Sequence, residues 1–262
     1  MAEILTNQAD LDRIFKKMEK DFGKLNKRQQ AYAVREIGRV RGELADMLAE
    51  HADSSGVISR RRAGMVLREL DAIEESLRKK GTIAVEHIAK ESSEFTSRAI
   101  GLGLMANQFD RVNEHVIKYI LKRQAADGLV LSERVWDLSG EIRDELATVI
   151  RSGIIKGEGI NSMIPKLRKV YDNESWKIRR LARNESLMAH RAAVSYNAQE
   201  SDVVKWVEFH AGVKRSPECV ALENEDRYGK GRGIYKPSDT DIWQPHVNCT
   251  GYISYVIDER RL

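Results

Sequence analysis

Residues of two types that bind metal ions gather near the end of the chain. The segment Gln244–Cys249 contains one of the two cysteines and one of the six histidines. Cysteine and histidine are common zinc ligands, and the spacing of His246 and Cys249 lets both side chains reach one ion from a turn. A Gly-rich connection before this segment can return the chain to Cys219. The sequence therefore predicts a metal site formed by Cys219, His246 and Cys249, which still needs a fourth ligand.

Two other hypotheses account for the same residues. A disulfide between Cys219 and Cys249 is the covalent alternative, although nothing in the sequence marks an exported protein. The cysteines can also be small buried apolar residues, with His246 hydrogen-bonded to a backbone carbonyl. Spacing alone leaves all three hypotheses open.

The composition is that of a protein rich in exposed helix. Hydrophobic residues make up 42% of the 262 residues and charged residues 32%, whereas only 6% are aromatic, which argues against a β-sandwich. The net charge is only +4, and the basic residues have acidic residues near them in the sequence. Nucleic-acid binding is therefore permitted but not required. The first residues lack the regions of a signal peptide, and no apolar run is long enough to cross a bilayer. We therefore expect a cytoplasmic protein that does not bind membranes.

Apolar residues recur at intervals of three and four over most of the first 200 positions. This period predicts long amphipathic helices that bury one stripe each. Glycine, aspartate and asparagine weaken helices, so we expect a break or bend near Gly23–Lys27, a helix end at Gly81 and another end near Tyr171–Asn173.

Beyond residue 200 the period changes from helical to strand-like. Residues alternate between apolar and polar over Val203–Phe209 and again over Thr250–Ile257. The predicted fold is mainly α with a small α+β domain at the carboxyl terminus. We expect an elongated helical region over residues 1–150, followed by a compact module of helix and strands over residues 151–262.

Several short motifs follow one another within residues 150–257. They are a glycine-punctuated turn, an arginine-rich helix, a tryptophan strand, a cysteine segment and a closing His-x-Asn-Cys segment, found respectively at Ile154–Gly159, Ile178–Glu185, Lys205–Trp206, Ser216–Leu222 and His246–Gly251. In this order they resemble the phage head morphogenesis family, the minor head proteins similar to those of phages SPP1 and Mu. The first 150 residues carry no motif of this family.

The resemblance implies a minor capsid protein rather than an enzyme. Such a protein associates with the portal and other head proteins during procapsid assembly in the host cytoplasm, becomes part of the virion, and contacts or accompanies packaged double-stranded DNA. The resemblance also implies that Arg183, Glu185, Trp206 and Asn248 are scaffold residues around the Cys219, His246 and Cys249 group. Because Arg183 and Glu185 are two positions apart on a helix, they cannot face each other, and each is expected to find a partner elsewhere.

The chain departs from the family pattern at two thiols. Many relatives carry Cys-x-x-Cys where this chain has Ser216 and Cys219, and a second terminal cysteine where it has Gly251. Zinc is therefore expected at an incomplete site. Residues of suitable type that could complete it are His210, Asp226 and Asp239.

An enzyme is the alternative hypothesis. It would be a metal-assisted nuclease or a domain similar to the ADP-ribosyltransferases sometimes fused to this family. A nuclease needs a polarising ion with an open position and a general base. Suitable residue types are His246 and the carboxylates of Glu218, Glu223, Glu225 and Asp226, but their spacing does not single out a base.

Overall fold

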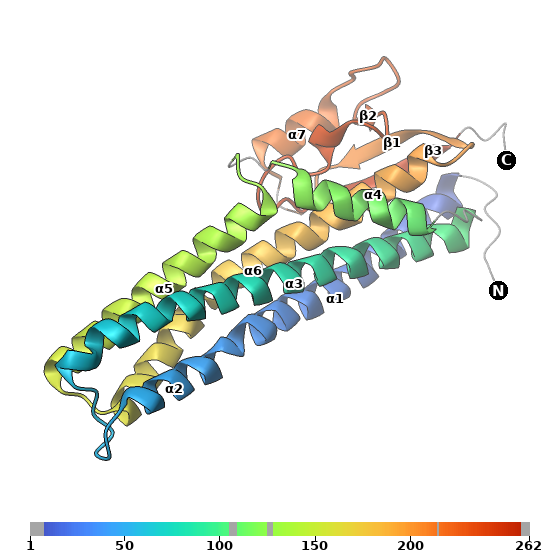
Figure 1. The fold of residues 1–262 in the computed structure, drawn as a ribbon. Coiled ribbons are helices and arrows are strands. Elements are labelled where there is room, and N and C mark those ends of the chain that lie inside the picture. Colours follow the sequence, from blue (N-terminus) through green and yellow to red (C-terminus); the bar gives the residue numbers. More distant parts are fainter. Residues whose placement is uncertain (1–7, 105–108, 125–127, 214, 258–262) are drawn as a thin grey trace. The chain divides into compact units, whose positions relative to one another are not determined.

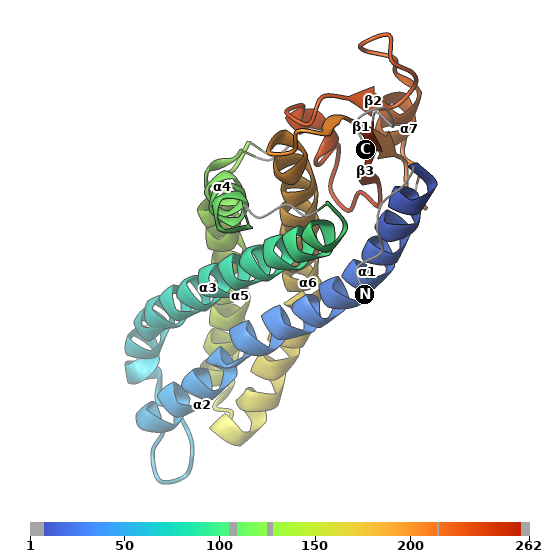
Figure 2. The same ribbon diagram turned by 90° about the vertical axis from the view of Figure 1, so that its right-hand side faces the viewer.

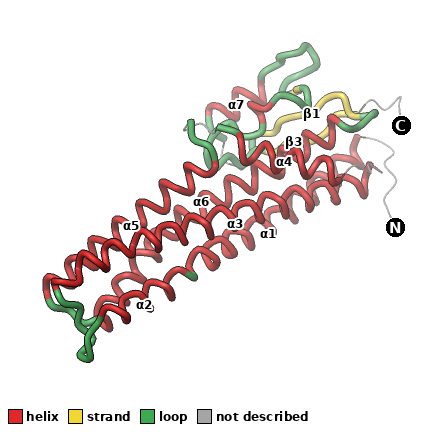
Figure 3. The backbone as a smooth tube through the Cα atoms, viewed as in Figure 1, coloured by secondary structure: helices red, strands yellow, loops and turns green. Residues whose placement is uncertain are grey.

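The protein is predominantly helical, and the strands of the described residues lie between positions 204 and 257 (Figure 1, Figure 3). A computed structural model describes residues 8–104, 109–124, 128–213 and 215–257. The helices are α1 (Gln8–Gly38), α2 (Val40–His51), α3 (Ala63–Leu104), α4 (Phe109–Lys122), α5 (Leu131–Lys156), α6 (Ile160–Gln199) and α7 (Pro217–Asn224). Two short 3-10 helices lie at Arg60–Arg62 and Thr240–Ile242, and the strands are β1 (Val204–His210), β2 (Ile234–Tyr235) and β3 (Tyr252–Ile257). The predicted fold class, mainly α with a small α+β part, is confirmed.

The chain forms two compact units, each built from separate stretches of sequence. Unit 1 comprises residues 1–29, 86–128 and 182–262, and unit 2 comprises residues 30–85 and 129–181. Helices α1, α3 and α6 contribute to both units. The boundary expected at residue 150 lies inside α5, within the second stretch of unit 2.

The three strands of unit 1 form an antiparallel sheet in the order β2-β1-β3. Val207 in the central strand pairs with Tyr235 on one side and Tyr255 on the other. Figure 2 shows the sheet and α7 grouped by the carboxyl end of α6 and the amino end of α1. The Gln8 side chain ties α1 to β3 by donating to the Tyr255 carbonyl at 2.8 Å and accepting from the Ile257 amide at 3.1 Å. The two predicted strands are confirmed.

The helix ends expected at Gly81 and Tyr171–Asn173 are wrong, and no break divides α1 at Gly23–Lys27. Helix α1 continues to Gly38, and α3 and α6 run through the other two positions. Tyr171 is buried, and its hydroxyl donates to the Val34 carbonyl at 2.8 Å within unit 2. Tertiary packing therefore outweighs the weak local preference of the Tyr-Asp-Asn segment.

Gly81 serves close packing between α3 and α5 in unit 2. A Cβ atom at this position would lie only 2.9 Å from Cγ1 of Val135. The missing side chain thus lets the two helices approach. None of the described helices has the length and apolar character needed to cross a membrane.

Candidate metal centre

Three side chains of residue types that can bind a metal ion meet in unit 1. Sγ of Cys219 lies 3.0 Å from Nε2 of His246 and 3.4 Å from Sγ of Cys249, and the three ligand atoms all lie within 4.8 Å of one another. Two thiolates bound tetrahedrally to one zinc ion would be about 3.8 Å apart, given Zn–S bonds of about 2.3 Å. The observed sulfur–sulfur separation of 3.4 Å is slightly shorter than this, so a small outward shift of the thiols would admit an ion.

The amino end of α7 positions Cys219. Ser216 is the N-cap, and its hydroxyl accepts a hydrogen bond from the Cys219 amide at 3.2 Å. Pro217 occupies the first turn, where its lack of an N–H costs nothing. Cys219 is completely buried in the first turn of this helix, where the backbone dipoles favour a negative sulfur.

A tight turn positions the other two ligands. The Cys249 amide donates to the His246 carbonyl at 3.3 Å, and Asn248 between them has a φ of 60°. Asparagine tolerates this left-handed conformation better than most residues. The Asn248 amide donates to Oδ1 of Asn184 on α6 at 3.0 Å, which anchors the turn. Asn248 therefore links this turn to α6 within unit 1.

The hydrogen bonds leave His246 ready to bind a cation. Its Nδ1 lies 2.9 Å from the Val247 carbonyl, which can only accept, so Nδ1 carries the proton. Nε2 of a neutral ring then presents its lone pair towards Cys219. A carbonyl that fixes the ring in this way is typical of metal-bound histidines. The hypothesis that His246 bonds a carbonyl and the metal-site hypothesis are therefore compatible.

A buried arginine holds the loop that carries the ligands. Arg191 on α6 is 1% exposed, and its guanidinium donates to the carbonyls of Trp243, Cys249 and Gly251 at 2.8, 2.9 and 2.6 Å. No pattern in the sequence assigns a role to Arg191. The signal that could have identified it is the run of small and apolar residues around it, Ala189, Ala192, Ala193 and Val194, which indicates a buried helix face.

Burial and charge act in opposite directions on the Cys219 thiol. Burial is the largest influence and raises its pKa, and the adjacent Cys249 raises it further. The Ser216 hydroxyl and the Arg191 charge lower the pKa. The Gly251 amide also donates to Sγ of Cys249 at 3.3 Å. These donors and the buried cation would stabilise sulfur ligands that have lost their protons to a metal ion.

The remaining candidate ligands lie in other contacts. His210 bonds Ser254 at 2.7 Å, Asp226 accepts from the Lys230 and Gly231 amides, and Asp239 bonds Tyr228. Within the described residues no further histidine, cysteine or carboxylate joins the three ligands. Both cysteines are free rather than joined as a disulfide.

Of the four expected scaffold residues, Arg183, Glu185 and Trp206 contact residues outside the ligand group, whereas Asn248 lies between two of the ligands. Glu185 is buried and pairs with Arg123 on two hydrogen bonds of 3.1 and 2.9 Å, while the Arg183 carbonyl accepts from Asn26. The Trp206 ring lies against Tyr228, with ring centroids 5.5 Å apart. Asn248 is thus the member of the set that belongs to the turn between two ligands.

Comparisons with protein-family models, with curated proteins and with solved structures found no match.

Proposed function

We propose that this chain is a minor head protein of a tailed phage or prophage and that Cys219, His246 and Cys249 hold a zinc ion. The supporting observation is that separate pieces of the family-like pattern converge on one site. Asn184 on the arginine-rich helix binds the closing segment at Asn248, and Cys219 from the cysteine segment contacts both other ligands. These contacts join positions 27 to 64 residues apart in the sequence.

The chemistry of the three ligands suits zinc. Two sulfur atoms and one imidazole nitrogen form a soft to borderline set, which hard cations such as magnesium do not favour. Zinc would supply a structural crosslink, because it would hold α7 and the 246–249 turn together where the intervening chain is mostly loop (Figure 3). The ordered module would then dock onto the portal, and the helices would contact other head proteins or DNA.

Elemental analysis tests the zinc proposal. The purified chain should contain about one zinc per molecule, and Cys219→Ser or His246→Gln should lose it. His210→Gln is a matched control, because this histidine bonds Ser254 outside the group. Absence of zinc in a chain purified without chelator, or equal loss in the His210 variant, would contradict the site.

A pull-down with the portal protein of the same phage tests the head-protein proposal. The wild-type chain should retain the portal, and the Cys219→Ser variant should retain less because its docking module is loosened. A chain that binds zinc but does not bind the portal would refute this function while leaving the metal site intact.

A metal-assisted nuclease is the second candidate, favoured by the three-ligand set, since catalytic zinc sites combine three protein ligands with one open position. Zinc-dependent cleavage of DNA that disappears in His246→Gln, but not in His210→Gln, would favour it over the structural role.

A further inference from the structure

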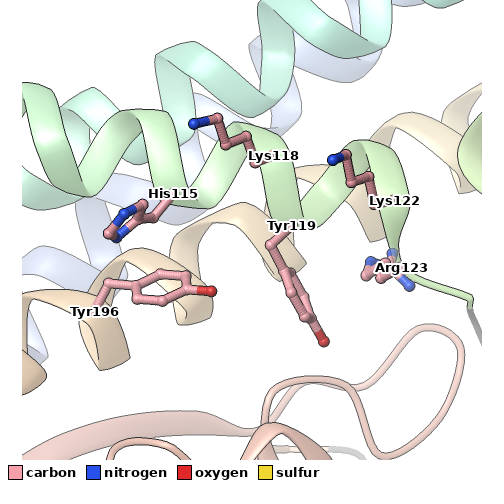
Figure 4. A pocket seen from close by; sticks show the side chains of 6 residues that line it. All are labelled: His115, Lys118, Tyr119, Lys122, Arg123 and Tyr196. Carbon is pink, nitrogen blue, oxygen red and sulfur yellow. The ribbon is translucent and has the colours of Figure 1, made fainter.

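A shallow open cavity of about 490 Å³ lies in unit 1 between α4 and α6. Its lining residues are His115, Lys118, Tyr119, Lys122, Arg123 and Tyr196. Figure 4 shows the hydroxyl end of Tyr196 directed towards Tyr119, with both lysines extending from α4 away from the two rings. The cavity shares no residue with the Cys219, His246 and Cys249 group. Its volume is within the range of small-molecule pockets.

The charged groups around this cavity are mainly positive. Among the residues that the structure describes, no carboxylate lines it, and two carboxylates pair with residues of its walls: Glu114 pairs with Lys118 at 2.7 Å, and Glu185 pairs with Arg123. Within the described residues, Lys122 forms no ion pair. It is exposed on the last turn of α4, so its ammonium is available to an anion.

The other wall of the cavity consists of two tyrosine rings that pack on a buried tryptophan. Tyr119 and Tyr196 pack edge-on against the buried Trp243 ring, with centroid distances of 4.9 and 5.3 Å. Both tyrosines are partly exposed. Burial raises the pKa of each phenol, so both keep their protons at neutral pH and can donate hydrogen bonds. A planar ring can therefore stack on these held side chains at low entropic cost.

We propose that this cavity binds a nucleotide, with the base against Tyr119 and Tyr196 and the phosphate near Lys118 and Lys122. The four residues of α4 lie at positions 115, 118, 119 and 122, the spacing of one helix face. Because the lysines and the rings line the same cavity but the lysines extend away from the rings, only an elongated ligand that continues along α4 can reach both. Its source is either a free nucleotide or one nucleotide of a single strand, because both present the same ring and phosphate.

Calorimetric titration at low salt with adenosine monophosphate tests this proposal. Adenosine and inorganic phosphate, each lacking one half of the ligand, should bind at least about tenfold more weakly. Lys122→Gln should weaken binding of the nucleotide by about tenfold, as expected for loss of one charge-assisted contact. Lys79→Gln, a matched change at an exposed lysine of unit 2, should leave binding unchanged.

The ring contact is tested at Tyr196. Tyr196→Leu should weaken nucleotide binding by about tenfold, whereas Tyr196→Phe should retain most of it because the ring is preserved. Equal affinity for phosphate and nucleotide, or an unchanged affinity in Lys122→Gln, would overturn the proposal. A short single-stranded oligonucleotide that competes with the nucleotide would identify a strand as the source. Failure to compete would identify the free nucleotide.

Discussion

Replacing Arg191 should loosen the loop that carries two of the candidate metal ligands. The guanidinium makes three hydrogen bonds to carbonyls of that loop. Charge-assisted bonds of about 1.5–3 kcal/mol each give a gross contribution of about 5–9 kcal/mol. Keeping the guanidinium out of water costs several kcal/mol, which must be subtracted. We therefore expect Arg191→Met to lower the free energy of unfolding by about 3 kcal/mol.

Urea denaturation would measure this loss, and hydrogen exchange would locate it. Amides of residues 243–251 should exchange faster in Arg191→Met, and zinc affinity should fall by about 10- to 100-fold, the usual effect of losing a group that supports metal ligands. Arg191→Lys keeps the charge but cannot bridge three carbonyls, so its loss should be intermediate. Arg180→Met, at an exposed position of the same helix, is the control. A loss below about 1 kcal/mol, or equal losses at both positions, would refute this account of Arg191.

Three further predictions concern the rest of the chain. Glu185→Gln should lower the free energy of unfolding by about 3–5 kcal/mol, because it leaves the buried Arg123 charge uncompensated. Replacing both residues by methionine should recover part of this loss. Additive losses of the two single variants in denaturation experiments would contradict the pairing. Burial raises the pKa of Tyr255 well above its ordinary value, so as the pH rises the unfolded state loses this proton before the folded state does. The free energy of unfolding should therefore decrease above about pH 10, by about 1.4 kcal/mol per pH unit. Tyr255→Phe should reduce that slope in alkaline denaturation, and an unchanged slope would assign it to other groups. Gly81→Ala should lower the melting temperature, whereas Gly42→Ala, where a Cβ meets open space, should raise it; a rise in both would show that the close approach at Gly81 is easily relieved.

Local sequence patterns predicted the helices, the two longer strands and the residue types of the candidate site. The pairing of Cys219 with His246 and Cys249 followed from ligand chemistry and a turn that could bring them together. Arg191 was missed because charged residues on helices are usually solvated, and only the small residues around it indicate burial. Its role depends on carbonyls more than 50 residues away, which no local pattern specifies.

The helix end predicted at Gly81 was wrong for a related reason. A glycine can weaken a helix, or it can permit a neighbour to approach, and the sequence does not distinguish these roles. At Gly81 the deciding fact is the position of Val135 on α5. The composition of the two units was equally hidden, because apolar periodicity shows which face of a helix is buried but not which helix covers it.

The two bonds from Gln8 to β3 also bear on the order of events during synthesis. They join residues 247 and 249 positions apart, so the first turn of α1 leaves the ribosome long before its partners exist. The stretches of unit 2 end at residue 181, and all of them are made before β3. Unit 2, with residues 30–38 of α1, can therefore fold while translation continues, whereas residues 8–29 of α1 complete their contacts in unit 1 only after β3 has been made.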